Sequence, residues 1–312
     1  MKATKWKSYS LALIAGMSVL TACSSDDNND NGGNGNNGNG NEIENGTTLK
    51  GTITSDVTLT AGSTYKLSGE YIVEDGATLN IEAGVKIISI YDDIVDYILV
   101  KQGGKINAVG TSSAPIVMTS EKEEPGAWGG IHICGKAHTN AEGGKGSSEI
   151  GGATYGGNDD ADNSGTLKYV RVEYSGYAFD SEHEANGITF YGVGNGTTVE
   201  YCQAYKGSDD GFEFFGGSVN VSNLVSVSCS DDSFDWTEGW NGKGTNLVAY
   251  QEAESTLGYD CDCLMECDNN GSNNAATPVA HPVLKNLILV GNGGSKQGIR
   301  LRAGTEVEID NA

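Results

Sequence analysis

The stretch that decides the fold is Asp210-Gly211-Phe212-Glu213-Phe214-Phe215-Gly216, because variants of it recur on both sides along the chain. It aligns with Asn186-Gly187-Ile188-Thr189-Phe190-Tyr191-Gly192 at an offset of 24 residues, and with Asp232-Ser233-Phe234-Asp235-Trp236-Thr237-Glu238 at an offset of 22. A period in the low twenties with alternating apolar residues is typical of a solenoid. Since the unit contains no helical segment, we expect an all-β parallel β-helix whose stacked coils share one core.

Alternation along these strands assigns their side chains to two faces. The inward set is expected to be Ile188, Phe190, Phe212, Phe214, Phe234, Trp236, Ile299 and Leu301. The outward set is then Thr189, Tyr191, Glu213, Phe215, Asp235, Thr237, Arg300 and Arg302.

Weaker repeats extend the pattern in both directions. Residues 73–80 match residues 100–107 at an offset of 27, and Gly196-Thr197-Thr198-Val199-Glu200-Tyr201 matches Gly304-Thr305-Glu306-Val307-Glu308-Ile309. The β-helix should therefore cover residues 47–312, with its first strands as an N-terminal cap and a Gly-rich loop near residues 135–165. By the second match Ala312 falls in mid-coil, so we expect a chain truncated at its C-terminal end, because a solenoid needs a closing cap.

The N-terminus has the organisation of a bacterial lipoprotein signal. Lys2, Lys5 and Lys7 precede an apolar run at residues 8–20, which is too short to span a bilayer comfortably. Leu20-Thr21-Ala22-Cys23 resembles a lipobox, so residues 1–22 are predicted to be removed and Cys23 to carry diacylglycerol. An ordinary signal peptide with an incidental cysteine is the alternative.

The residues after Cys23 predict a flexible tether and a signal for export to the cell surface. Ser24-Ser25-Asp26-Asp27 look like the acidic export signal of surface lipoproteins, although they also suit the start of a solvated linker. The Asn/Gly/Asp tract to residue 41 has nothing apolar to bury, so residues 23–46 should be flexible. Loss of three lysines with residues 1–22 moves the net charge from −23 to −26. Such a chain disfavours nucleic acid and attracts divalent cations.

Four segments carry a family resemblance: residues 78–84 (TLNIEAG), 126–131 (GAWGGI), 155–165 (YGGNDDADNSG) and 209–217 (DDGFEFFGG). They look like a Bacteroidota-type family of right-handed β-helix surface lipoproteins, related to a spirochaete outer-membrane lipoprotein. The resemblance covers nearly the whole mature chain. It implies a right-handed β-helix anchored at the cell outer membrane and facing the exterior, and it implies no catalytic residues.

An acidic ladder is the strongest candidate site. Asp209, Asp210 and Glu213 recur one coil later as Asp231, Asp232 and Asp235, and Glu266 and Asp268 extend the series at an uncertain register. Stacked carboxylates repel one another, so we expect either a Ca²⁺ ion or turn caps that accept backbone N–H bonds.

Two further clusters have open alternatives. Asp160, Asp162, Ser164 and Gly165 match the opening of a Ca²⁺ loop, but Arg171 stands where an EF-hand needs glutamate, so an Asx-rich turn is the alternative. Cys261, Cys263 and Cys267 lack the spacing of a zinc site and suit a local disulfide or buried thiols.

The remaining candidates concern ligand binding. Tyr191 and Phe215 are outward aromatics that suit sugar stacking, unless the 135–165 loop covers them; Arg300 and Arg302 are candidate ligand contacts. The leading hypothesis is a non-enzymatic surface protein that binds a glycan or a protein partner, with structural calcium. A polysaccharide hydrolase or lyase acting on acidic glycans and a purely structural, adhesin-like protein are the alternatives, and the usual hydrolase motifs are absent.

Overall fold

The computed structural model describes residues 41–179 and 183–312. The expected signal peptide, Cys23 and residues 24–40 of the expected tether lie outside the described residues. The expectation that residues 41–43 belong to a flexible tether is wrong, because they form a strand that pairs with residues 57–59 of the β-helix. Within the described ranges, no helix has the length and apolar character needed to cross a membrane.

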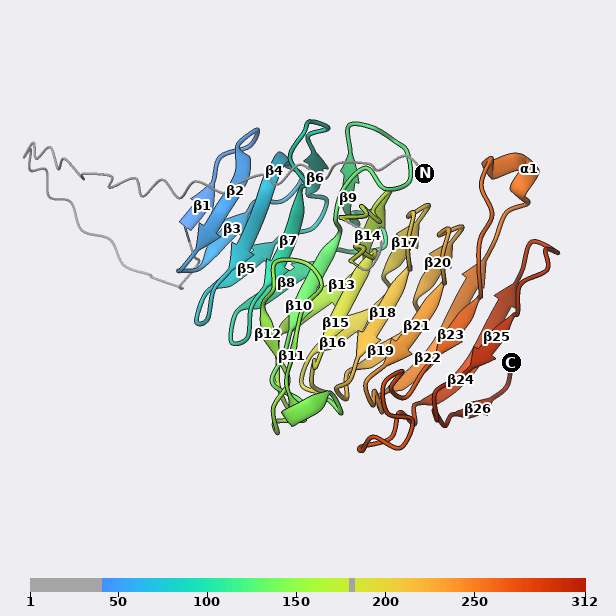
Figure 1. The fold of residues 1–312 in the computed structure, drawn as a ribbon. Coiled ribbons are helices and arrows are strands. Elements are labelled where there is room, and N and C mark those ends of the chain that lie inside the picture. Colours follow the sequence, from blue (N-terminus) through green and yellow to red (C-terminus); the bar gives the residue numbers. More distant parts are fainter. Residues whose placement is uncertain (1–40, 180–182) are drawn as a thin grey trace, which may run out of the picture. The chain divides into compact units, whose positions relative to one another are not determined.

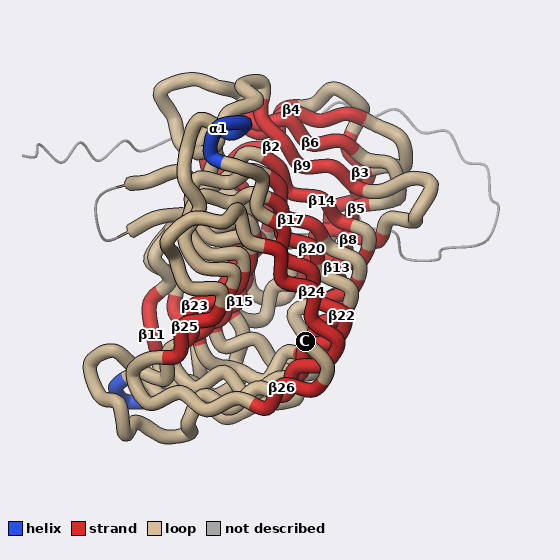
Figure 2. Tube along the Cα trace, turned by 90° about the vertical axis from the view of Figure 1, so that its right-hand side faces the viewer, coloured by secondary structure: helices blue, strands red, loops and turns tan. Residues whose placement is uncertain are grey.

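The described chain is a right-handed parallel β-helix in which each coil contributes strands to three walls (Figures 1 and 2). The first wall contains β7 (Tyr97–Val100), β10 (Ile131–Cys134), β15 (Ile188–Tyr191), β18 (Phe212–Phe215), β21 (Phe234–Thr237), β23 (Met265–Cys267), β25 (Ile299–Leu301) and the second halves of β2 (Thr48–Ile53) and β4 (Thr64–Val73). The second wall contains β1 (Asn41–Ile43), β3 (Val57–Leu59), β5 (Thr78–Ile81), β8 (Lys105–Val109), β13 (Gly165–Lys168), β16 (Thr198–Glu200), β19 (Asn220–Ser222), the first halves of β22 (Lys243–Tyr250) and β24 (Val283–Val290), and β26 (Glu308–Asp310).

The third wall contains the first halves of β2 and β4, then β6 (Lys86–Ser89), β9 (Ile116–Ser120), β14 (Val170–Glu173), β17 (Gln203–Tyr205), β20 (Val225–Val227) and the second halves of β22 and β24. Outside the walls lie a short antiparallel pair, β11 (Gly146–Ser147) with β12 (Thr154–Tyr155), the single-turn helix α1 (Glu254–Leu257) and a 3₁₀ turn at Glu142–Gly144.

The coil register follows the predicted repeats. Ile188 pairs with Phe212 and Phe212 with Phe234, at the expected offsets of 24 and 22 residues, and Val73 pairs with Val100 at the offset of 27. Alternation then places the predicted apolar side chains inside the coil. The register of this part of the fold was therefore predictable from sequence.

Aromatic side chains stack along the core axis in the central coils. The rings of Phe190 and Phe214 lie 5.1 Å apart, those of Phe212 and Phe234 5.5 Å apart, and that of Phe214 packs 4.2 Å from Trp240. Pairs of this kind add about 0.5–1.5 kcal/mol each beyond their burial. The stacks fix the coil spacing directly beneath the acidic face of the first wall.

From β13 onward, a column of residues in the left-handed conformation lies at the end of the second-wall strand of each coil. It contains Tyr169, Tyr201, Asn223, Asn246, Asn286 and Asn311, all with φ between 50° and 63°. The asparagine side chains bond to one another from coil to coil, with Asn246 Nδ2 3.0 Å from Asn223 Oδ1 and Asn286 Nδ2 2.9 Å from Asn246 Oδ1. Asparagine tolerates this conformation and supplies both a donor and an acceptor, so it suits the turn.

Two expectations about the last coil need correction. Ile299 and Leu301, predicted as core residues, are 36% and 51% exposed, because within the described residues β25 pairs with β23 on one side and with no strand on the other. The match of residues 196–201 with residues 304–309 is two residues out of register. The pairings run from Val199 through Val221, Gly244 and Leu284 to Ile309. A slip of two residues keeps every side chain on its face, so alternation alone could not detect it.

Candidate functional site

The acidic ladder forms one row on the outer face of the first wall. Thr189 pairs with Glu213, Glu213 with Asp235, and Asp235 with Glu266. The row ends at Arg300, which pairs with Glu266. The structure thus settles the register of Glu266 and places it in line with the two acids before it.

A second acidic column lies just before these strands and has a capping role. The Asn186 Oδ1 atom accepts a bond from the Asp210 N–H group at 3.1 Å. Asp210 Oδ1 in turn accepts one from the Asp232 N–H group at 2.9 Å. Asp232 Oδ1 accepts the next, from the Cys263 N–H group at 2.6 Å. One oxygen of Asp210 and one of Asp232 therefore act as the turn caps that were an alternative to a metal site.

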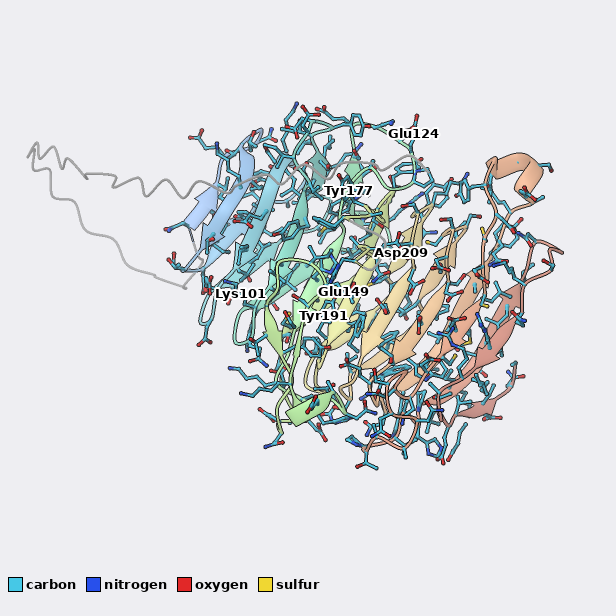
Figure 3. All side chains as sticks on the ribbon, in the orientation of Figure 1. Lys101, Glu124, Glu149, Tyr177, Tyr191 and Asp209 are labelled. Atoms are coloured by element: carbon cyan, nitrogen blue, oxygen red, sulfur yellow. The ribbon has the colours of Figure 1, made fainter. Side chains whose placement is uncertain are left out.

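Two loop glutamates complete the cluster. Glu149 comes from the loop between β10 and β13, and Glu184 from the loop between β14 and β15. Figure 3 shows Glu149 and Asp209 on the same face of the ribbon. The cluster surrounds a cavity of about 200 Å³, here called the acidic cavity, which is lined by Glu149, Glu184, Asn186, Asp209, Asp210, Glu213, Asp231, Asp232, Asp235 and Glu266.

Burial and mutual repulsion raise the pKa values of these carboxyl groups. The pKa of Asp209 rises to about 8, first because the group is buried and then because Glu184 and Asp231 are close. Burial, followed by the charges of Asp231 and Glu266, also raises the pKa of Asp232 to about 8. For Asp210, Glu213 and Asp235 the pKa lies well above its usual value for the same two reasons. Ionisation of these carboxyl groups at neutral pH is therefore opposed unless a cation enters the cavity.

Two arginines and a lysine contact the margin of the cluster. Arg300 and Arg302 both bind the Glu266 carboxylate, and Arg302 also binds Asp268 at 2.8 Å. Lys296 lies 2.6 Å from Asp262. Among the residues that the structure describes, none of Asp209, Asp210, Glu213, Asp231, Asp232 and Asp235 forms an ion pair with a Lys, Arg or His side chain.

The carboxylate oxygens are close enough to share an ion. Ligand atoms of Asp210, Glu213 and Asp235 all lie within 4.8 Å of one another, and so do those of Asp232, Asp235 and Glu266. The two groups share Asp235. Calcium takes six to eight oxygen ligands at 2.3–2.6 Å, which allows oxygens at these separations to bind the same ion.

The loop of residues 135–164 covers part of the aromatic row beside the acids. Tyr191 is fully buried, and the centre of the Tyr155 ring lies 5.1 Å from the centre of its ring. The Tyr191 hydroxyl donates a hydrogen bond to Glu149. The expectation that Tyr191 is open for sugar stacking is therefore wrong, and the alternative of a covering loop is right for this residue. Phe215 stacks on Tyr191 at 4.7 Å but stays half-buried.

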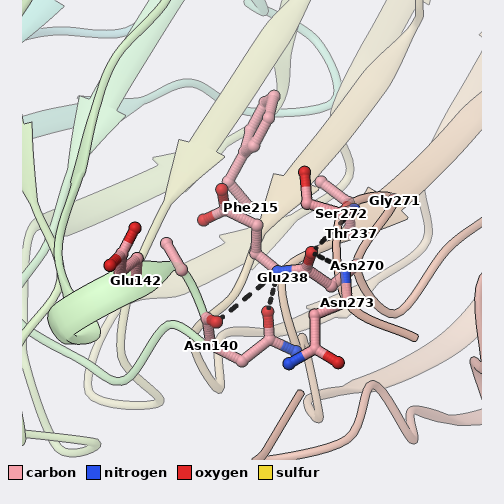
Figure 4. A pocket seen from close by; sticks show the side chains of 10 residues that line it. Asn140, Glu142, Phe215, Thr237, Glu238, Asn270, Gly271, Ser272 and Asn273 are labelled. Carbon is pink, nitrogen blue, oxygen red and sulfur yellow. Dashed lines mark hydrogen bonds between the residues drawn. The ribbon is translucent and has the colours of Figure 1, made fainter. Parts of the chain in front are cut away.

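Phe215 forms one side of a pocket of about 620 Å³, here called the Phe215 pocket (Figure 4). Its lining residues are Asn140, Ala141, Glu142, Phe215, Thr237, Glu238, Asn270, Gly271, Ser272 and Asn273. Asn270 donates to Asn140 Oδ1 at 2.9 Å, and Glu238 accepts bonds from Thr139 and Tyr155 at 2.6 and 2.8 Å. Amide, hydroxyl and carboxylate groups are thus fixed around one aromatic ring.

The Asp160–Asp162 loop does not join the acidic cavity. Asp160 bonds to His138 Nδ1 at 2.6 Å, and Asp162 accepts bonds from Ser164 and Gly194. The N–H group of Gly165 donates to Asn163 Oδ1 in the manner of an Asx turn. Within the described ranges neither aspartate belongs to a group of three that could hold a metal ion. This geometry fits the turn alternative.

The cysteines of the described ranges are buried free thiols. Cys134, Cys202, Cys229, Cys261, Cys263 and Cys267 form no disulfide, so the buried-thiol alternative applies to the 261–267 cluster. Cys263 also lies near Asp232 and Asp262 at the edge of the acidic cavity.

Sequence reasoning missed Glu149, Glu184 and Glu238 as members of the site. Glu149 and Glu184 come from loops outside the repeat, where no periodic signal exists. Glu238 was visible as the last residue of the third repeat copy, but nothing in the sequence placed it beside Tyr155.

Comparison with known proteins agrees with this architecture. Residues 51–312 match the family model described as the pectate-lyase-like beta helix domain. No curated protein and no solved structure matches the chain. Since the match covers most of the sequence, the chain belongs to the pectate-lyase-like β-helix family.

Proposed function

We propose that this protein is a lipid-anchored β-helix of the cell surface that binds a glycan in the Phe215 pocket and holds a Ca²⁺ ion in the acidic cavity. One observation carries the proposal: the same two strands supply both sites. β18 presents Glu213 to the cavity and Phe215 to the pocket, and β21 presents Asp235 and Thr237 in the same way. The family, whose model is named for pectate lyases, is consistent with a glycan-related role.

The case for calcium rests on charge. Two ionised carboxylates about 4.8 Å apart repel by roughly 3–4 kcal/mol at an effective dielectric near 20. Six acids on two adjacent coils cannot all ionise at that cost without a counter-charge. A hard divalent cation fits an all-oxygen cluster, and one oxygen each of Asp210 and Asp232 is already held in place by its backbone bond.

The case for a glycan rests on the pocket. Its volume is within the usual range of small-ligand sites, and it offers an aromatic face with fixed polar groups around it. The C–H face of a sugar ring packs on an aromatic ring, and Asn140, Glu238 and Ser272 are suited to its hydroxyl groups.

Binding to a glycan array, followed by titration of the best oligosaccharide, tests the pocket. Phe215→Ala should weaken binding about tenfold, which corresponds to about 1.4 kcal/mol. Because Phe215 also packs on Tyr191, Ser272→Phe serves as a second variant that fills the pocket from an exposed position. Tyr250→Ala, on the third wall, should bind as the wild type does. Unchanged affinity in both pocket variants would refute the proposed site.

A second function has one observation in its favour. Asp209 and Asp232, with pKa values of about 8, retain protons at neutral pH, as the general acid of a glycoside hydrolase must. A lyase base is harder to find, because Arg300 and Arg302 are held by Glu266 and Asp268. If the wild type releases reducing sugars from polygalacturonate and Asp209→Asn does not, the protein is an enzyme instead.

The anchor is tested in cells. Proteinase K added to intact cells should remove the protein, and Cys23→Ala should release it from the membrane fraction. Protection until lysis would place the chain in the periplasm.

A further inference from the structure

The outer face of the second wall carries a polar groove that the proposed function does not use. The groove has a volume of about 370 Å³ and lies across three coils. Its outward side chains are Thr198, Glu200, Asn220, Ser222, Lys243 and Thr245. Thr198 pairs with Asn220, Glu200 with Ser222, and Ser222 with Thr245, so hydroxyl and amide groups recur at the coil spacing.

Two stacked tyrosines stand beside this groove. The rings of Tyr169 and Tyr201 lie 4.6 Å apart at an angle of 11°, and Tyr201 is 43% exposed. Tyr201 follows Glu200 in the chain and donates its N–H group to the Ser222 carbonyl at 3.0 Å, so it adjoins two groove residues. The Lys168 ammonium lies 3.0 Å from Glu200 and 5.8 Å from the Tyr201 ring centre.

The turn itself does not require tyrosine. Tyr169 and Tyr201 occupy the left-handed position, with φ of 50° and 55°, that the later coils fill with Asn223, Asn246, Asn286 and Asn311. A bulky side chain is strained in this conformation, whereas asparagine is tolerated. Strained residues persist where another role compensates for the strain, and functional sites are where they cluster.

We propose that the groove and the Tyr169–Tyr201 pair form a second glycan-binding surface, which takes a neutral polysaccharide chain. A stacked aromatic pair offers a platform for the C–H face of a sugar, and the repeated hydroxyl and amide groups match a ligand that is itself a repeating polyol. The net charge of −23 repels polyanionic chains. This surface is separate from the Phe215 pocket and does not depend on calcium.

The test is affinity electrophoresis of the purified protein in gels that contain a soluble glucan, xylan or mannan. The wild type should be retarded by at least one of these polysaccharides in chelator. Tyr201→Asn should reduce the affinity at least tenfold without lowering the melting temperature, because asparagine is the residue that the later coils have at this turn. Thr198→Tyr, which fills the groove from an exposed position, should have the same effect on binding.

One control separates this surface from other exposed tyrosines. Tyr250→Ala removes a tyrosine of equal exposure on the third wall and should leave the retardation unchanged. The proposal is overturned if no neutral polysaccharide retards the wild type, or if Tyr201→Asn binds normally. It is also overturned if Tyr201→Asn unfolds at a lower temperature, because the tyrosine pair would then serve the fold.

Discussion

Two columns of stacked polar side chains run along this β-helix, one of asparagines and one of aspartates, and they form different hydrogen bonds at the same coil spacing. In the turn between the second and third walls, Asn223, Asn246, Asn286 and Asn311 form a chain of side-chain hydrogen bonds. On the first wall, Asp210 and Asp232 stack at the same coil spacing, but their side chains bond to backbone N–H groups instead. An amide carries a donor and an acceptor, so identical amides can bond to one another; an ionised carboxylate carries only acceptors. In-register stacking is therefore stabilising for the asparagines and costly for the acids unless a proton or a cation joins them.

The largest expected effect is a pH dependence that arises in the acidic column. The pKa values of Asp209 and Asp232 are raised to about 8 in the folded protein, whereas the unfolded chain has ordinary values near 4. Between these limits the folded state binds more protons than the unfolded state, so the free energy of unfolding falls as pH rises. In chelator, the melting temperature should drop on the order of 5–10 °C between pH 5 and pH 8.

The matched variant for this pH scan is Asp210→Asn with Asp232→Asn. Asparagine keeps the oxygen that accepts the backbone bond, so the caps survive while two charges are lost. The variant should melt higher than the wild type at pH 8 and show a flatter pH profile. Asp93→Asn, at an exposed acid outside the cavity, should leave the profile unchanged. A wild-type melting temperature that rises with pH would contradict the assignment.

A smaller effect is expected when a carboxylate is placed in the asparagine column. Asn246→Asp removes the donor to Asn223 and keeps the acceptor for Asn286. Loss of one exposed hydrogen bond should cost about 1 kcal/mol, or roughly 2–4 °C in the melting temperature. Thermal unfolding at pH 8 measures the cost, and at a pH where the new carboxyl is protonated most of it should disappear. An equal loss at both pH values would mean that the amide acts through something other than its donor.

The sequence predicted those parts of this comparison that depend on the repeat. The offset of 22 residues between Phe212 and Phe234 places Asp210 over Asp232 and Glu213 over Asp235, because alternation and coil stacking leave one register. The same reasoning failed at residues 304–309, where a slip of two residues keeps the alternation intact.

The parts that depend on loops could not be predicted in this way. Glu149 reaches the acidic cavity, and Tyr155 covers Tyr191, only because a 30-residue insertion folds back on the first wall. No local pattern encodes where such an insertion packs. For the same reason the sequence identified the row of acids but not the cavity that these acids line together with Glu149 and Glu184.

Calcium-dependent thermal unfolding at pH 8 tests the central claim most directly, namely that a cation neutralises the acidic column. An ion that binds only the folded state at a hundredfold excess over its Kd adds about 2.7 kcal/mol. Millimolar Ca²⁺ should therefore raise the melting temperature of the wild type by several degrees over chelator, and Asp210→Asn with Asp232→Asn should lose that increment. If Ca²⁺ leaves the wild type unchanged, the acids act as protonated caps and no calcium site exists at millimolar affinity. If the increment survives in the double variant, the ion does not depend on Asp210 and Asp232, and Glu184, Asp209 and Asp231 are the next candidates.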